Sequence, residues 1–211
     1  MTTRSKARPT PWRQRAGGTL FLVTGAGLVV HLLVGLPLWL TVFGGIGLAA
    51  AAFLALGGGA LGAALGRRVQ LGLICGAVAT VAYDTTRWLF VTLTHSSIGP
   101  FAAWPLFGAG LIGTGAPAWT RWTAGGAYHV TNGLLFGVAF TVWLGDRGPL
   151  WGIGFALLLE AFMLGLYPGW LHIAAFGEFA QVSMLGHLAY GATLGLLARR
   201  LLTNSAGERP A

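Results

Sequence analysis

Charged residues are scarce in this chain. Only 9% of the 211 residues are charged, whereas a soluble domain carries about 25% charged residues. Negatively charged residues are rarer than positively charged ones, with five Asp and Glu against 13 Lys and Arg. This composition excludes an ordinary soluble globular domain.

Cysteine is almost absent. The single cysteine, Cys75, lies within an apolar run, so no intramolecular disulfide can form and a thiolate metal site is not indicated. The sequence also lacks a phosphate-binding loop and the Cys-x-x-Cys-His pattern of haem attachment. It therefore carries no ready signature of a cofactor.

Apolar residues are abundant and lie in long runs. They make up 55% of the chain, and the mean hydropathy is +0.71. Apolar runs of about 20 residues are long enough to cross a bilayer as helices. The sequence therefore predicts an all-α, polytopic membrane helical bundle.

The 35 glycines lie inside the apolar runs, where they favour close helix packing rather than a flexible linker. Gly58, Gly62 and Gly66 recur every four residues and predict one flat strip for packing. Other glycines accompany polar residues and mark the buried sides of later helices. They are Gly133, Gly137, Gly186, Gly191 and Gly195.

The runs predict six transmembrane helices between residues 18 and 200. Their expected positions are 18–38, 43–66, 69–94, 122–145, 149–171 and 179–198. Residues 1–17 are expected to form a basic cytoplasmic tail, and residues 201–211 a disordered cytoplasmic tail. Residues 95–120 are apolar but broken by prolines, which favours a re-entrant or interfacial segment between the third and fourth helices.

The basic residues flank the apolar runs and set the expected topology. With six spans and the N-terminus inside, nearly all Lys and Arg lie on the cytoplasmic side, while Arg121 lies outside and Arg87 within the membrane. We therefore expect a multi-pass protein of the bacterial inner membrane, with both termini in the cytoplasm. The positive-inside rule of membrane proteins explains the basic charge better than binding to a nucleic acid does, so the expected partner is the lipid bilayer. A homo-oligomer or a larger membrane complex is also compatible with the sequence.

Several polar residues interrupt the apolar runs. A lone charge at bilayer depth costs at least about 2.5–3.5 kcal/mol, so such groups usually pair inside the protein. The predicted topology places them in one layer between the mid-plane and the outer surface. The candidates for this outward-facing polar cluster are Asp84, Arg87, His129, Asn132, Glu160, His187 and Tyr190.

Spacing brings some of these residues onto one helical face. Asp84 and Arg87 are three residues apart, as are the members of His129-x-x-Asn132 and His187-x-x-Tyr190. A structural interpretation remains open for each, since Asp84 and Arg87 could pair within their helix and each histidine could serve as an interhelical hydrogen-bonding group. Glu160, in mid-span, must be either paired or protonated.

Asp84, His129, Glu160 and His187 also form a candidate carboxylate–imidazole ligand set. Such ligands suit a transition metal such as zinc, iron or manganese. However, no helix carries His-x-x-x-His or Glu-x-x-His. The same four groups would equally serve a proton relay.

The last third of the chain resembles a known membrane family. The features, in order, are a His-led span (residues 129–140), Leu150-Trp151-Gly152, Tyr167-Pro168, Glu178, Gly186-His187 with an aromatic residue at 190, and Arg199-Arg200. This order resembles the YagU-like family of bacterial inner-membrane proteins. The resemblance implies an inner-membrane location and a link to acid resistance, and it does not cover the first two spans or Asp84-x-x-Arg87.

Residues 186–195 are also similar to the last catalytic helix of rhomboid proteases. Those enzymes need a Gly-x-Ser-Gly nucleophile on a preceding helix, and residues 149–171 contain no serine. A serine protease is therefore excluded.

Three functions remain in competition. The first is proton or ion handling at the polar cluster. The second is a membrane-embedded, metal-dependent enzyme acting on an apolar or lipid substrate. The third is a structural or assembly subunit whose polar groups only lock the helices together.

Overall fold

The computed structural model describes residues 11–170 and 175–207. Much of the expected basic tail, the end of the fifth expected span with His172, and residues 208–211 of the expected C-terminal tail lie outside these ranges. Within them, residues 11–17 begin a helix and residues 201–207 continue one. These parts of the two expected tails are therefore helical.

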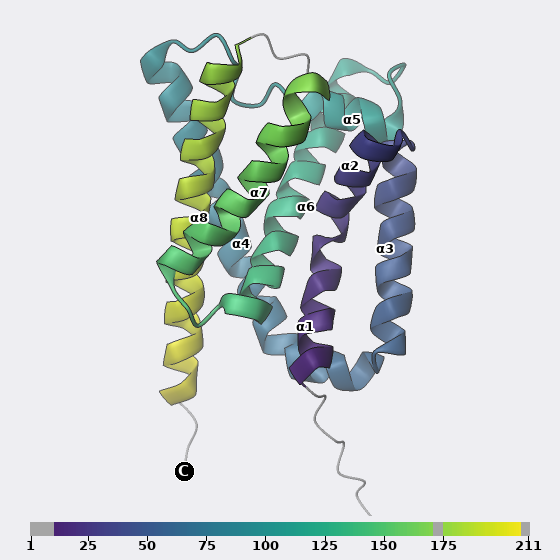
Figure 1. Ribbon diagram of the computed structural model, residues 1–211, viewed down its shortest axis with the longest axis vertical. Helices are drawn as coiled ribbons and strands as arrows, with labels where there is room; N and C mark the ends of the chain where they lie inside the picture. Colours follow the sequence, from purple (N-terminus) through teal and green to yellow (C-terminus); the bar gives the residue numbers. More distant parts are fainter. Residues whose placement is uncertain (1–10, 171–174, 208–211) are drawn as a thin grey trace, which may run out of the picture.

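The described part of the chain forms helices and turns without strands, which confirms the all-α prediction (Figure 1). The elements in chain order are α1 (Pro11–Thr19), the 3-10 turn η1 (Leu20–Leu22), α2 (Val23–Val34), α3 (Leu38–Ala55), α4 (Gly58–Thr94), α5 (Trp104–Ile112), α6 (Ala118–Leu144), α7 (Pro149–Trp170) and α8 (Phe176–Gly207).

Five helical segments are long and apolar enough to cross a membrane. They are Pro11–Val34, Leu38–Ala55, Gly58–Thr94, Ala118–Leu144 and Pro149–Tyr167. These segments support a multi-pass integral membrane protein. Helix α8 is long as well and packs along α4 and α7 (Figure 1), but Gln181, Ser183 and His187 make it less apolar than the other five.

The boundary between the second and third expected spans is wrong. Residues 43–66 and 69–94 were expected to be separate helices, whereas α4 runs without a break from Gly58 to Thr94. The chain turns instead at Gly57, which adopts a left-handed φ of 106° that glycine tolerates best. Arg67 and Arg68 do not end a helix because arginine is a good helix former, and Arg68 donates a hydrogen bond to the backbone carbonyl of Thr141 at 2.7 Å.

Residues 95–117 contain one short helix, α5, which has nine residues. At 1.5 Å per residue it is about 14 Å long, roughly half the thickness of a bilayer core. It packs against α6 near the end of the bundle where α4 finishes (Figure 1). The backbones come very close there, since a Cβ at Gly108 would collide with the carbonyl of Arg121 and one at Gly125 with that of Trp104.

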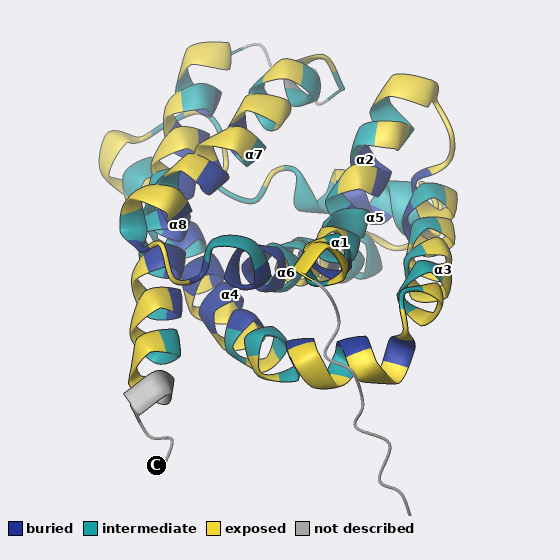
Figure 2. Cartoon of the chain, turned by 60° about the horizontal axis from the view of Figure 1, so that its bottom comes forward, coloured by how far each residue is buried: buried dark blue, intermediate teal, exposed yellow. Residues whose placement is uncertain are grey.

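Glycines form the crossing of α4 with α6. A Cβ on Gly72 would lie 2.5 Å from the Cα of Val138, and one on Gly137 would lie 2.5 Å from the Cα of Gly76. Two small-xxx-small pairs, Gly72/Gly76 and Gly133/Gly137, therefore face each other. Burial concentrates along this seam, whereas α3 is mostly exposed (Figure 2).

The crossing of α7 with α8 is built in the same way. A Cβ at Gly152 would collide with the carbonyl of Gly191, and one at Gly195 would lie 2.5 Å from the carbonyl of Gly148. The sequence correctly indicated the packing role of Gly133, Gly137, Gly191 and Gly195. The expected strip of residues 58, 62 and 66 is not a helix crossing, since the nearest atom to a Cβ there is 3.4 Å away or farther.

We predict that Gly137→Ala destabilises the protein by about 1–3 kcal/mol, because its methyl group would overlap backbone atoms of α4 that cannot move aside. Gly154→Ala on α7 is the control, since a Cβ there meets no atom within 4 Å. Thermal unfolding in detergent micelles should show a lower midpoint for Gly137→Ala alone. Equal midpoints for the two variants would contradict the packing described for this crossing.

Candidate functional site

Tyr83 lies at the centre of the polar residues. It is 6% exposed, and its ring contacts two imidazoles, with centroids 5.6 Å from His129 and 5.0 Å from His187. The three rings come from α4, α6 and α8. The residues expected to form a cluster are therefore gathered around an aromatic side chain that the sequence did not single out.

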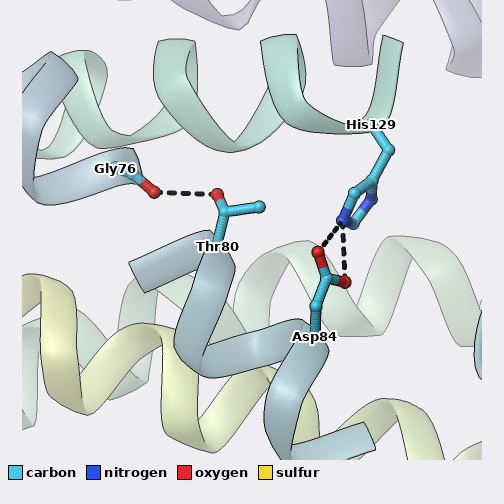
Figure 3. A network of polar contacts seen from close by, with 4 residues as sticks. All are labelled: Gly76, Thr80, Asp84 and His129. Atoms are coloured by element: carbon cyan, nitrogen blue, oxygen red, sulfur yellow. Dashed lines mark hydrogen bonds and ion pairs between the residues drawn. The ribbon is translucent and has the colours of Figure 1, made fainter. Parts of the chain in front are cut away.

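The first polar pair joins α4 to α6. The Nε2 atom of His129 lies 3.0 Å and 3.2 Å from the two carboxylate oxygens of Asp84 (Figure 3). Both side chains are half-buried, at 18% and 21% exposure. One turn earlier, the Thr80 hydroxyl donates to the carbonyl of Gly76 at 2.7 Å (Figure 3), and it fits there only because Gly133 has no side chain.

The second pair joins α7 to α8 and is more deeply buried. Glu160 is 2% exposed and His187 is 7% exposed. The Nδ1 atom of His187 lies 2.8 Å from Oε2 of Glu160 and 3.0 Å from the carbonyl oxygen of Ser183. The Ser183 hydroxyl donates to the same Oε2 at 2.7 Å.

This network assigns the protons of the second pair. Both neighbours of His187 Nδ1 are acceptors, so Nδ1 carries a hydrogen. Oε2 of Glu160 accepts two hydrogen bonds, which leaves Oε1 as the oxygen able to hold a proton. Oε1 is buried and has no hydrogen-bond partner among the described residues. Such an unpartnered oxygen is costly to bury.

Arg87 does not pair with Asp84 on its own helix. Its guanidinium carbon lies 5.0 Å from the centroid of the Tyr83 ring, and its aliphatic stem packs against Gly186. Arg87 is 8% exposed, and its Nε atom has no hydrogen-bond partner in the described part of the chain. The intrahelical pair that the sequence left open is therefore not formed, because Asp84 contacts His129 on α6 instead.

Tyr190 and Asn132 have different roles. The Tyr190 hydroxyl donates to the carbonyl of Gly133 at 2.7 Å, a buried bond that ties α8 to α6. The side-chain oxygen of Asn132 is buried and lacks a hydrogen-bond partner among described atoms. Asn132 instead faces the cavity beside the pairs.

A cavity of about 100 Å³ adjoins the cluster, which is room for several water molecules. Its polar wall includes Arg87, His129, Asn132 and His187, but neither Asp84 nor Glu160. The two carboxylates thus hold the histidines in place without lining the cavity themselves. The rest of the wall is largely aromatic and apolar, and its larger members are Trp104, Phe107, Phe136, Leu159, Met163, Tyr167 and Phe179.

The four candidate metal ligands form two pairs rather than one set. Across the described ranges, no group of three or more His, Cys, Asp and Glu side chains is placed to hold a metal ion. The two imidazoles, of His129 and His187, each contact the Tyr83 ring and belong to separate pairs. The geometry therefore gives no support to the expected ligand set.

The loop after α4 is fastened over the cavity by Glu178. One carboxylate oxygen of Glu178 accepts hydrogen bonds from the Ser96 hydroxyl, the Ser97 hydroxyl and the Ser97 amide at 2.7–2.8 Å. The loop continues to Pro100 and Trp104, which line the cavity. The sequence predicts Glu178 as a solvated residue near the membrane interface and does not indicate this role as a loop anchor.

Ser183 was also missed from the sequence. Its hydroxyl bonds to Glu160 and its carbonyl to His187, so it joins both members of the second pair. The signal was present, because Ser183 stands four residues before His187 and so lies on the same helical face.

Comparisons of the chain with protein-family models, with curated proteins and with solved structures found no match.

We predict that Ser183→Ala lowers the free energy of unfolding by about 1–2 kcal/mol, because buried Glu160 loses a donor. Thr203→Ala is the control, since it removes a hydroxyl bond of an exposed residue and should change stability by less than about 0.5 kcal/mol. Chemical unfolding in mixed micelles measures both. Wild-type stability in Ser183→Ala would show that Glu160 does not depend on this hydroxyl.

A second prediction concerns pH. Hydrogen bonds from Ser97 and Ser96 lower the pKa of the Glu178 carboxyl. A lowered folded-state pKa means that these bonds stabilise the loop above the ordinary Glu value of about 4.3 and that this stabilisation is lost as pH falls through the folded-state pKa. Hydrogen exchange at the Ser97 amide should therefore accelerate relative to its intrinsic rate on acidification.

Glu178→Gln is the matched variant for this test. Its Ser97 amide should be less protected at neutral pH and should lose the pH dependence. Unchanged protection of the wild-type amide in strong acid would contradict the anchoring role of Glu178.

Proposed function

We propose that this multi-pass membrane protein takes up and releases protons at the cluster around Tyr83. The observation that carries the proposal is the presence of two carboxylate–imidazole pairs, at 2.8 and 3.0 Å, beside a cavity within the helical bundle. Intramembrane carboxylates and histidines in contact are the usual elements of proton relays.

The physical reason lies in the charge of such a pair. With one proton, a carboxylate–imidazole pair is neutral whether the proton sits on nitrogen or on oxygen. Without it, the pair carries one negative charge, and His129 and His187 are of the residue type that titrates nearest to neutral pH. In each pair the imidazole can donate a hydrogen bond to the carboxylate and so stabilise the deprotonated state, which an isolated buried carboxylate lacks.

The position of the cavity indicates how protons would reach the pairs. His129 and His187 both line it and both contact Tyr83, and water within it would connect the two imidazoles. The loop fastened by Glu178 lies at the same end as α5 (Figure 1). We place this end outside and both termini in the cytoplasm, with α8 as the sixth span.

The location proposed is the bacterial inner membrane. Its support is the basic residues at the opposite end of the bundle, near Arg67, Arg147 and Arg199, together with the resemblance of residues 129–200 to the YagU-like family. The link of that family to acid resistance agrees with a proton-exchanging site.

The test is proton flux into liposomes that contain the purified protein and a trapped pH-sensitive dye. We predict that Glu160→Gln reduces the flux driven by an imposed pH gradient at least tenfold, because the amide cannot exchange a proton. Asp84→Asn should reduce it as well. Asp146→Asn is the control and should retain the wild-type flux, since Asp146 is exposed in the turn between α6 and α7 and does not line the cavity.

The structural interpretation predicts a different pattern. If the pairs only hold the helices together, liposomes with the wild-type protein or with any variant should show the same flux as protein-free liposomes. Glu160→Gln should then change only the stability of the protein. That result would overturn the proposal.

A further inference from the structure

We infer that the cavity binds a small organic monoanion, a carboxylate with a short apolar body, with Arg87 as its counter-ion. The coupling of this binding to protons rests on the proposed function, whereas the anion site itself rests on the placement of Arg87. Neither of the two pairs accounts for this cation, so it requires a separate explanation.

Arg87 is a buried cation that forms no ion pair with a carboxylate of the described residues. It is 8% exposed, it lines the cavity, and its Nε atom has no hydrogen-bond partner in the described ranges. The two carboxylates of the cluster are already engaged, Asp84 with His129 and Glu160 with His187 and Ser183. The Tyr83 ring stabilises the guanidinium through its face but does not neutralise it.

The polar groups that face the cavity suit an anion. Arg87 donates hydrogen bonds at any pH near neutrality, whereas the free ring nitrogens of His129 and His187 become donors when the rings are protonated, because the other nitrogen of each ring already contacts a carboxylate. No Asp or Glu of the described chain lines this wall. A guanidinium is the group that best matches a carboxylate, through two parallel hydrogen bonds.

The apolar part of the wall selects an organic anion over a bare inorganic ion. Trp104, Phe107 and Phe136 together with Met163 cover much of the cavity. The free volume of about 100 Å³ is smaller than the roughly 150 Å³ cavity that accepts benzene. A ligand of the size of propionate fits this space.

Charge balance couples the anion to a proton. Every titratable or charged group that lines the cavity, or that pairs with a histidine lining it, enters this account; α5 contributes none. These groups are Tyr83, Asp84 and Arg87 on α4, His129 on α6, Glu160 and Tyr167 on α7, and His187 and Tyr190 on α8.

The tyrosines are neutral near pH 7, so the balance involves Arg87 and the two pairs. The site is neutral when the pairs hold a single proton between them, because one net negative charge then offsets Arg87. A second proton leaves the site with the charge of Arg87 alone, which a bound monoanion neutralises. Binding of the anion and uptake of the second proton therefore favour each other.

The experiment uses the full-length protein in nanodiscs, with sodium propionate as the probe and saturation-transfer NMR as the readout. Empty nanodiscs give the background. Propionamide, which has the same shape without charge, and chloride, which has charge without an apolar body, are the competitors. We expect propionate to bind and neither competitor to displace it at equal concentration.

The variants assign the binding to Arg87. Arg87→Gln should weaken propionate binding at least tenfold, Arg87→Lys should weaken it less, and Arg147→Gln, which lies outside the cavity wall, should leave it unchanged. Thermal unfolding checks that each variant is folded. If Arg87→Gln does not fold, the comparison of propionate with propionamide on the wild-type protein decides.

The outcomes separate this inference from the proposed function. Displacement by propionamide, equal binding by a folded Arg87→Gln variant, or no binding to the wild type would overturn the anion site. If propionate binding depends on Arg87 but is the same between about pH 6 and about pH 8, the anion site is supported and the proton coupling is refuted. With coupling, the dissociation constant should rise toward tenfold per pH unit in the range where the proton is lost.

Discussion

The high cost of an unpaired charge in a membrane governs the centre of this structure. Asp84 and Glu160 stand on helices otherwise rich in apolar residues, and each is held against a histidine of another helix. Neither carboxylate is matched by a residue of its own helix. The two carboxylates are therefore paired only when α4, α6, α7 and α8 are assembled, so that pairing favours the correct arrangement of these helices.

The glycine crossings make this pairing geometrically available. Gly72 and Gly76 let α4 approach α6 at backbone contact, and Gly152 does the same for α7 and α8. An imidazole reaches only a few ångströms from its helix, so wider spacing would leave the carboxylates unpaired. The same close approach brings the Tyr83 ring into contact with His129 and His187, so packing and electrostatics depend on one another here.

Sequence reasoning identified the class of fold and most members of the polar centre. The all-α membrane architecture follows from apolar run lengths, and Asp84, His129, Glu160 and His187 stand out because charge in such runs is expensive. The sequence alone does not decide the partner of Asp84, because it allows contact with Arg87 on the same helix as well as with His129 on another helix. The structure decides for His129, since α6 lies against that face of α4.

Helix boundaries were less predictable for a related reason. Arg67-Arg68 appeared to end a span, but a basic pair does not oppose helix formation, and the break occurred at Gly57, where the backbone requires a positive φ. Glu178 was overlooked because a surface carboxylate gains its importance from the group placed opposite. The spacing of Ser183 and His187 indicates a shared helical face, but it does not show the bond from Ser183 to Glu160 on another helix. Such roles arise from tertiary contacts that local pattern does not contain.

The central claim is that the buried pairs change protonation with pH, and nitrogen-15 NMR of the histidine rings tests it most directly. The account predicts that Nδ1 of His187 keeps its hydrogen, as its two acceptors require, while the remaining ring nitrogens of His187 and His129 change their chemical shifts in a pH series measured over a range of about 5 to 8. It also predicts that Glu160→Gln displaces the His187 transition. Ring nitrogen shifts of both histidines that stay fixed across this range would contradict the account.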